Sequence, residues 1–211
     1  FCFKHHYLLH ALDSEPACAL LMAMRERRAV ELQLQSQRTG ARMQRTVYPL
    51  CLYVSTQTGR QYLLCRHYRS RRMCFFRLDG IRRVTPGAPE PNADRYLADC
   101  ARFRRHLWGV SVGEARGTAH LTLTIHAGAD EGHIPRRLQR ERRCGTVEQL
   151  DAETWRFTAD VYDPMELLPW LRTFIGRIVS LECSDRRVTD AFAADLAALA
   201  ALYGGNDDAV L

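Results

Sequence analysis

GRQYLLCRHYRSRRMCFFRLDGI, residues 59–81, holds two apolar, aromatic-rich runs separated by a polar turn. Runs of this kind, bounded by polar residues, are typical of neighbouring β-strands. The same region is unusually basic: from Arg60 to Arg83 the chain has eight arginines and a single carboxylate, Asp79. The whole chain of 211 residues has a net charge of only +6. The charge is therefore local, and its cause should be local.

Further strands are expected on the amino-terminal side of this pair. From Val30, the segment VELQLQSQ alternates apolar and polar residues, as a half-buried strand does. A turn at Gly40 follows, and TVYPLCLYVS then forms another β-rich run, which TQTG joins to RQYLLCRHY. Short strands joined by tight turns predict an antiparallel sheet that is compatible with a small barrel.

The residues before these strands are predicted to be helical. From Lys4 to Arg28 apolar residues recur at helical spacing, and Ser14 followed by Pro16 predicts a helix start within this region. His6 and His10 lie four residues apart, a spacing that can hold a metal. We favour a surface pair or a partner contact for these histidines, and we expect the chain to bind no metal and no cofactor.

The segment TPGAPEPN, residues 85–92, has three of the eight prolines and no large apolar side chain, so we predict a linker there. Asn92 is placed to cap a following helix, DRYLADCARFRRHL. The apolar face of that helix is expected to hold Tyr96, Leu97, Cys100, Phe103 and Leu107.

After Gly117 the order of elements is legible from the sequence. It reads strand AHLTLTIH, helix DEGHIPRRLQRERR, strand GTVEQL, strand TWRFTADVY, helix DPMELLPWLRTF and strand RIVSLEC. This β-α-β-β-α-β order is that of the ferredoxin-like split motif, in which four antiparallel strands carry two helices on one face. A last helix is expected to stop at Gly204 and Gly205, and residues 206–211 to fray.

Composition limits the class of protein. With 46% hydrophobic residues the chain can bury a core, and it has no apolar run long enough to span a membrane. We find no secretory leader, and the absence of an initiator methionine suggests a fragment. The eight cysteines form no regular framework, which favours reduced thiols in a cytoplasmic protein. The pI near 9.0 favours an anionic partner.

Strand alternation suggests what the arginines do. In RQYLLCRHY it places Tyr62, Leu64 and Arg66 on one side of the strand, and in MCFFRL it places Phe75 beside Arg77. A guanidinium matches phosphate with two parallel hydrogen bonds, and an adjacent ring offers a base a surface to stack on. The alternative is a solvated basic face whose cations protect an edge strand from aggregation.

The segment RTVYPLCLYVSTQTGRQYLLCRHYRSRRMCFFRLDGI resembles the WYL domain. The positions that match its pattern are Arg45, Pro49, Gly59, Tyr62, Leu63, Phe76, Arg77, Leu78, Asp79 and Ile81. Three positions depart from it: Gln61 stands for the Trp, Cys74 for the first Arg of the closing motif and Gly80 for a later Arg. Arg71 and Arg72 lie close enough to Cys74 in sequence to compensate.

Residues 117–204 look like the WCX extension that commonly follows WYL domains, on the strength of ELLPWLRTFIGRIVSLEC with Trp170. The resemblance implies an α+β protein, with an Sm-like β-barrel and a ferredoxin-like domain joined by helical linkers. We accordingly divide the chain into a helical connector (1–28), the WYL barrel (29–86), a linker with a helix (87–116), the WCX domain (117–205) and a tail (206–211).

The resemblance also implies a function. WYL proteins are mostly bacterial transcription regulators, which tend to form dimers and usually carry a DNA-reading module before the WYL domain. Residues 1–28 are too short for that module, and we interpret them as its connector. We predict the ligand-sensing and dimerising part of such a regulator, binding a nucleic acid or a nucleotide-like anion. The residues predicted to hold that ligand are Arg45, Arg66, His67, Tyr68, Arg72 and Arg77.

Two of these assignments have specific consequences. Reversal of the charge at Arg77 should abolish binding. His67 can donate to a phosphate, although it equally suits a plain position on the barrel surface. Neutralisation of mutually repelling arginines by the ligand is expected to shift the domains and reposition the DNA-reading heads.

The basic helix, the tryptophans and the lack of catalytic motifs bear on other possible functions. Arg136, Arg137, Arg140 and Arg143 recur at helical spacing and can track a nucleic-acid backbone, but a solvated helix face is the interpretation we favour. Trp108, Trp155 and Trp170 are expected in the core or an interface. No catalytic motif is found, so we expect no enzyme. The alternative function is an accessory modulator of a nucleic-acid-targeting defence system without its own operator.

Overall fold

A computed structural model describes residues 14–36, 39–55, 59–113 and 117–204. This part of the chain is mixed α+β, with five α-helices and two antiparallel sheets. Residues 1–105 and 109–112 form one compact unit, and residues 106–108 and 113–211 form a second. None of the described helices combines the length and the apolar character needed to cross a membrane.

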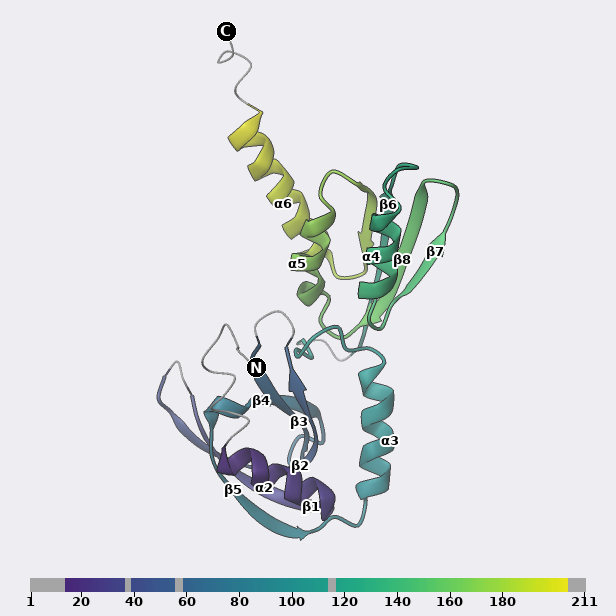
Figure 1. The fold of residues 1–211 in the computed structure, drawn as a ribbon. Helices are drawn as coiled ribbons and strands as arrows, with labels where there is room; N and C mark the ends of the chain where they lie inside the picture. The colour runs from purple at the N-terminus through teal and green to yellow at the C-terminus, as the bar shows by residue number, and fades with distance from the viewer. Residues whose placement is uncertain (1–13, 37–38, 56–58, 114–116, 205–211) are drawn as a thin grey trace. The chain divides into compact units, whose positions relative to one another are not determined.

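The first unit is built on a five-stranded antiparallel sheet with the order β4-β3-β2-β1-β5 (Figure 1). Its strands are β1 (Arg28–Gln35), β2 (Arg42–Val54), β3 (Gln61–His67), β4 (Met73–Arg77) and β5 (Ile81–Pro89). Gly40, at the predicted turn between β1 and β2, has a φ of 69°, a left-handed conformation that glycine adopts without a steric penalty.

Helix α2 (Glu15–Arg25) covers one face of this sheet. It begins where predicted, because the Ser14 hydroxyl accepts a hydrogen bond of 3.3 Å from the Ala17 N–H and Pro16 lies in the first turn. Leu20 and Ala23 pack against the inward residues of the strands, which are Val30, Leu32, Leu34, Val47, Leu63 and Cys65. The alternation that predicted β1 is thus the alternation that builds this core. The rest of the predicted connector, residues 1–13, including His6 and His10, lies outside the described residues.

The sheet curves around α2 but does not close (Figure 1). Strands β4 and β5 are its two edges, and no ladder joins them within the described residues. The prediction of a closed Sm-like barrel is therefore wrong, and the structure shows an open sheet. β4 has only five residues and is followed at once by the 3₁₀ turn Leu78–Gly80, and the outer half of β5 carries prolines that lack a donor for a further ladder.

The predicted linker at residues 85–92 is largely a strand. β5 continues to Pro89, and Val30 lies opposite Pro86 while Arg28 lies opposite Pro89. Proline within a sheet is tolerated on an edge strand, where one side of the strand makes no hydrogen bonds to a neighbour. The proline count signalled an edge strand, and we interpreted it as a linker.

Helix α3 (Ala93–Arg104) covers the opposite face of β2 and β3. Its Tyr96 ring meets Tyr48 edge-on, with 5.5 Å between ring centroids, and Arg104 lies over Tyr53 at 5.8 Å from the ring centroid. Asn92 is at the predicted cap position, but its side chain makes no capping hydrogen bond to the helix. Both faces of β3 are thus covered, which explains why Leu64 is as fully buried as Leu63.

The second unit contains a four-stranded antiparallel sheet with the order β7-β8-β6-β9. Its elements are β6 (Ala119–His126), α4 (His133–Glu141), β7 (Thr146–Gln149), β8 (Thr154–Val161), α5 (Leu168–Leu171), β9 (Ile178–Cys183) and α6 (Arg186–Tyr203). The predicted order of strands and helices is found element by element. Its assignment as a ferredoxin-like WCX domain stays a prediction.

Two details of this unit bear on the predictions. The expected continuous helix over residues 163–174 is three short pieces, two 3₁₀ turns around α5, with a proline at the start of α5. Trp170 is buried against Trp108, Phe157 and Phe174, each with ring centroids 5.0 Å away. The core placement predicted for Trp108 and Trp170 is confirmed.

Candidate anion-binding pocket

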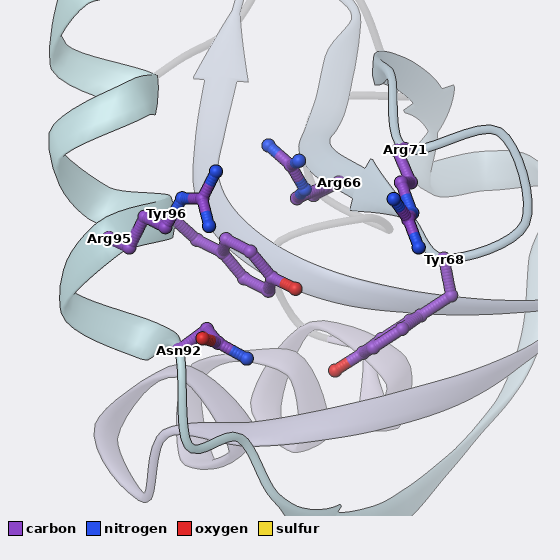
Figure 2. A pocket seen from close by; sticks show the side chains of 6 residues that line it. All are labelled: Arg66, Tyr68, Arg71, Asn92, Arg95 and Tyr96. Atoms are coloured by element: carbon purple, nitrogen blue, oxygen red, sulfur yellow. The ribbon is translucent and has the colours of Figure 1, made fainter.

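A pocket of about 370 Å³ opens in the first unit between α3 and the β3–β4 hairpin. Figure 2 shows side chains entering it from two sides: Asn92, Arg95 and Tyr96 from the start of α3, and Arg66, Tyr68 and Arg71 from the hairpin. These six residues include three guanidinium groups and no carboxylate. The volume lies in the range of small-ligand sites, and the lining offers charge-assisted donors and aromatic faces.

The hairpin turn directs two of these side chains. The His67 N–H donates to the Arg72 carbonyl at 2.9 Å, and the Ser70 N–H donates to His67 Nδ1 at 3.2 Å. Within this turn Arg71 has a φ of 54°, a left-handed conformation that is uncommon for residues other than glycine. Its side chain is exposed and makes no ion pair with a described residue, and the same holds for Arg95.

Arg66 is the anchored arginine of the pocket. Its guanidinium donates to Asp99 of α3 at 3.2 Å and lies over the Tyr96 ring, 4.5 Å from the centroid. The two partners of the ion pair are 18% and 22% exposed, so water screens the pair only partly. Asp99 is shared, because Arg102 also donates to it. A ligand anion that reaches Arg66 therefore competes with a carboxylate already in place.

Tyr68 of the lining is held by Glu90, a buried carboxylate that does not itself line the pocket. The Tyr68 hydroxyl donates to Glu90. Burial is the main cause that raises the pKa of Tyr68, and this hydrogen bond to a carboxylate raises it further. Partial burial acts to raise the pKa of Glu90, but hydrogen bonds from Tyr68 and from Asn92 outweigh it and lower that pKa. Glu90 is thus an ionised carboxylate whose oxygens accept hydrogen bonds from Tyr68 and Asn92, and Tyr68 is a neutral phenol held in one orientation.

The structure separates the residues that the sequence grouped. Only Arg66 and Tyr68 of the predicted set line the pocket. Arg45 and His67 lie on the opposite face of the sheet from Arg66, because Arg45 is opposite the core residue Leu32 and His67 is opposite Val47. They border a shallow groove of about 560 Å³, which Tyr68 also reaches.

Arg72 and Arg77 line neither hollow. Arg72 is exposed next to Arg71. Arg77 is opposite Tyr62, four residues along the ladder from the Arg66 pair, which is about 13 Å at the usual rise of a strand. Its guanidinium binds Asp79 with two hydrogen bonds, one of them 3.0 Å long, and this pairing raises the pKa of Arg77. The neighbourhood of Phe75 and Arg77 is as predicted, but it is not at the pocket.

Three lining residues were missed as ligand contacts, namely Asn92, Arg95 and Tyr96, and Arg71 was considered only as a substitute for the arginine expected at position 74. The signal for Tyr96 was present, since it was placed on the packing face of its helix. What the sequence did not provide was the surface against which that helix packs. Arg95, one residue before Tyr96, follows from the same docking of α3 onto β2 and β3.

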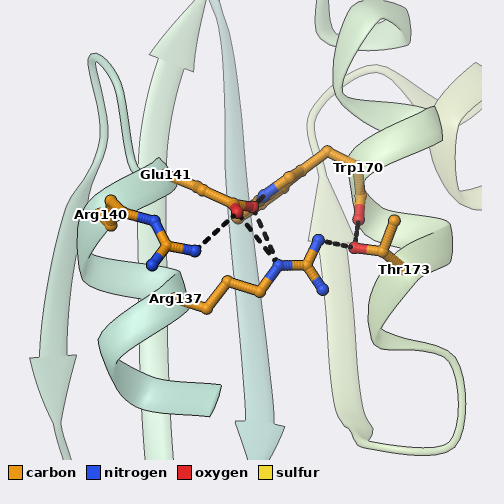
Figure 3. A network of polar contacts seen from close by, with 5 residues as sticks. All are labelled: Arg137, Arg140, Glu141, Trp170 and Thr173. Carbon is orange, nitrogen blue, oxygen red and sulfur yellow. Dashed lines mark hydrogen bonds and ion pairs between the residues drawn. The ribbon is translucent and has the colours of Figure 1, made fainter. Parts of the chain in front are cut away.

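The basic helix of the second unit has a different character. Figure 3 shows Arg137 donating to Glu141 at 3.1 Å and to the Thr173 hydroxyl at 2.8 Å, while the Trp170 indole N–H donates to Glu141 at 2.9 Å. Arg140 also pairs with Glu141, and Arg143 donates to the Trp108 carbonyl. Of the four arginines predicted to recur along this helix, only Arg136 makes no such contact with a described residue.

No group of three metal-ligating side chains is found within the described ranges. The pair His6 and His10 lies outside them. The three guanidinium groups that line the pocket between α3 and the hairpin can hold an anion by hydrogen bonds and charge.

Part of the first unit is similar to a known protein family. Residues 18–86 match the sequence profile of the WYL domain. The match begins within α2 and ends within β5, so it includes the hairpin but not α3. No curated protein matches the sequence significantly.

Two solved structures are similar to the chain as a whole. Proteasome accessory factor B/C of Arthrobacter aurescens aligns with 90% of the chain at 17% identity and a TM-score of 0.40. A CRISPR Cas-related protein aligns with 89% at 10% identity and a TM-score of 0.48. The chain spans 28% of the first protein and 52% of the second.

Proposed function

We propose that this chain is the ligand-sensing part of a WYL-type transcription regulator, and that the pocket between α3 and the β3–β4 hairpin binds a nucleic acid or a nucleotide-like anion. The single observation that carries the proposal is the convergence of Arg66, Arg71 and Arg95 on one pocket whose lining has no carboxylate. The WYL match at residues 18–86 supports the regulatory role.

The chemistry of the lining favours a phosphate with an attached planar group. Arg71 and Arg95 are exposed cations without an ion-pair partner among the described residues, and a phosphate satisfies several of their donors at once. Tyr68 and Tyr96 offer ring faces and hydroxyls to the same ligand. The role assigned to the pocket is binding, with no catalytic step.

The proposed response follows from the Arg66–Asp99 ion pair. An anion that binds Arg66 in place of Asp99 breaks one ion pair between the hairpin and α3. Helix α3 is the last element before the chain continues into the second unit. In the full regulator this change would reach the DNA-reading module that binds the operator. A WCX character of residues 117–204 and a homodimer belong to the same proposal, and the mass of the chain in solution tests the dimer.

Fluorescence anisotropy with short labelled single-stranded DNA, single-stranded RNA and duplex DNA, titrated across salt concentrations, tests the binding function. We expect salt-sensitive binding of a single strand. Because hydrogen bonds to charged groups contribute about 1.5–3 kcal/mol, Arg71→Glu and Arg95→Glu should each weaken it roughly ten- to hundredfold. Competition by free nucleotides separates a nucleotide site from a strand site.

Two matched variants make the test specific. Arg83→Glu makes the same charge change on an exposed arginine of β5, and Arg77→Glu makes it at the residue that the sequence pattern selected. The pocket proposal expects a small effect from both. If Arg83→Glu weakened binding as much as Arg95→Glu, the chain would bind anions by diffuse charge and the pocket assignment would be wrong. If only Arg77→Glu abolished binding, the site would lie at the other end of β3.

A further inference from the structure

Two cysteine side chains face each other across the β3–β4 ladder. Cys65 on β3 lies directly opposite Cys74 on β4, and their Sγ atoms are 3.5 Å apart. Each thiol also lies near the carbonyl of the other residue, at 3.6 and 3.8 Å. The sequence had separated these cysteines by nine positions and gave no reason to pair them.

The backbone already has the geometry that a disulfide needs. Residues directly opposite each other in an antiparallel ladder have Cα atoms about 4.5–5.5 Å apart. Disulfides join Cα atoms that are roughly 4.4–6.8 Å apart, with an S–S bond of about 2.05 Å. Rotation of the two side chains is therefore enough to bring the sulfur atoms from 3.5 Å into bonding distance, without a shift of strand register.

We propose that Cys65 and Cys74 form an oxidisable thiol pair, a modification site at which a hydroperoxide converts two thiols into a cross-strand disulfide. Cys74 is the attacking residue, because it is half-buried on the edge strand β4, whereas Cys65 is fully buried. Cys65 is the resolving residue. The proposal rests on these strands alone and does not depend on what the pocket binds.

The reaction balances with one hydroperoxide for each pair. With hydrogen peroxide, the Cys74 thiolate attacks one peroxide oxygen, so that an S–O bond forms and the O–O bond breaks. The hydroxide that leaves takes up the proton that Cys74 gave up and becomes water. The Cys65 sulfur then attacks the Cys74 sulfenic acid, the S–S bond forms and the S–O bond breaks. The second hydroxide takes the Cys65 proton and leaves as water, and the two thiols have lost two electrons in all.

The protonation states favour this division of roles. The hydrogen bond from the Cys65 thiol lowers the pKa of Cys74, which outweighs the opposing effect of burial. Burial is the main cause that raises the pKa of Cys65, and its hydrogen bond with Cys74 raises it further. Since the thiolate is the nucleophile, Cys74 is the residue prepared to react first. The product would fix the edge strand β4 to β3 and close a loop around the turn that carries Tyr68 and Arg71.

A second pair provides an internal comparison. Cys51 of β2 and Cys100 of α3 also hydrogen-bond through their thiols. They lie on a strand and a helix and have no ladder to hold their Cα atoms opposite each other. Cys144 and Cys183 of the second unit are half-buried, and burial raises the pKa of each.

Peptide mapping by mass spectrometry tests the proposal on the full chain. The reduced protein is treated with one equivalent of hydrogen peroxide, free thiols are alkylated, and trypsin digestion follows without reduction. We expect the peptides Gln61–Arg66 and Met73–Arg77, each with one cysteine, to appear joined with the loss of two hydrogens. In the folded chain this link should form before Cys144 or Cys183 is modified. In guanidinium, where the strands are unfolded, Cys65 and Cys74 should be linked no faster than the other cysteines are modified.

Variants complete the test. Cys51→Ser should leave the link intact, and Cys74→Ser should leave Cys65 as a free thiol after the same treatment. The proposal is overturned if Cys65 and Cys74 stay unlinked while Cys144 or Cys183 oxidises. It is also overturned if the folded chain forms mainly the Cys51–Cys100 link, or if Cys74 proceeds to sulfinic acid without joining Cys65.

Discussion

Arg137 of the second unit and the pocket residues Arg71 and Arg95 of the first unit are in different environments. In the second unit Arg137 is enclosed by Glu141, Thr173 and the Phe174 ring, whose centroid is 4.9 Å from the guanidinium carbon (Figure 3). In the first unit Arg71 and Arg95 extend into a pocket without an ion-pair partner among the described residues (Figure 2). Two basic segments that look alike in sequence thus differ in whether their charge is already neutralised. A neutralised arginine stabilises its own unit, and an unneutralised one is available to a ligand.

The largest expected effect is a loss of stability when the ring of Trp170, which donates to Glu141 in the second unit, is removed. Trp170→Ala removes a buried side chain that packs on Phe157 and also donates to Glu141. We expect a loss of about 3–5 kcal/mol in the free energy of unfolding, measured with denaturant. Trp170→Phe keeps the ring contact and should lose less. Arg71→Ala in the first unit should change stability by less than about 0.5 kcal/mol, as exposed substitutions usually do. Equal losses for Trp170→Ala and Arg71→Ala would contradict the comparison.

A smaller effect is expected from neutralisation of the network's carboxylate. Glu141→Gln removes the charge that holds Arg137 while keeping an acceptor, and should cost about 1–3 kcal/mol. Burial acts to raise the pKa of Glu141, but hydrogen bonds from Arg137 and Trp170 outweigh it and the pKa is lowered. The ionised group is therefore favoured by folding, so its contribution is present above the ordinary glutamate pKa and is lost as pH falls through the lowered one.

The pH dependence gives this prediction its control. The difference in unfolding free energy between the unmodified chain and Glu141→Gln should be full at neutral pH and should shrink in acid. A difference that stayed constant into acid would show that Glu141 is not held as a carboxylate by its partners.

The smallest effect is expected at the pocket's own ion pair. Asp99→Asn releases Arg66 from a partly buried pair worth about 0.2–1 kcal/mol, so single-strand affinity should rise by a factor between about 1.4 and 5. Asp94→Asn makes the same charge change on the same helix, at a side chain that is 81% exposed and pairs with Arg27. An equal gain from both variants would mean that net charge, rather than competition for Arg66, sets the affinity.

Local pattern was enough to predict much of the fold. The Ser14 cap, the turn at Gly40, the alternation of β1 and the order of elements from Ala119 to Tyr203 depend on short-range periodicity and turn chemistry, which a sequence contains. The closed barrel was wrong because the edge strands β4 and β5 form no ladder within the described residues, and local pattern does not show which strands meet. The linker at residues 85–92 was wrong because proline content alone does not distinguish a linker from an edge strand.

The candidate site was harder to predict for a physical reason. Residues close in sequence on a strand alternate between faces, so Arg66 and His67 are separated by the sheet although they are neighbours in the chain. The other half of the pocket comes from α3, and its place depends on contacts such as Tyr48 with Tyr96 that no local pattern contains. The match to the WYL domain covers the hairpin but ends before α3, so it does not supply these residues.

The most direct test of the account is a paired measurement on two arginine substitutions, Arg95→Gln and Arg137→Gln. For each variant, the free energy of unfolding and the affinity for a labelled single strand are measured under the same conditions. We expect opposite outcomes for the two substitutions. Arg95→Gln should weaken binding at least about tenfold and leave stability unchanged, whereas Arg137→Gln should lower stability by about 1–3 kcal/mol and leave binding unchanged. If both substitutions changed the same property by the same amount, the distinction between the two units would be wrong.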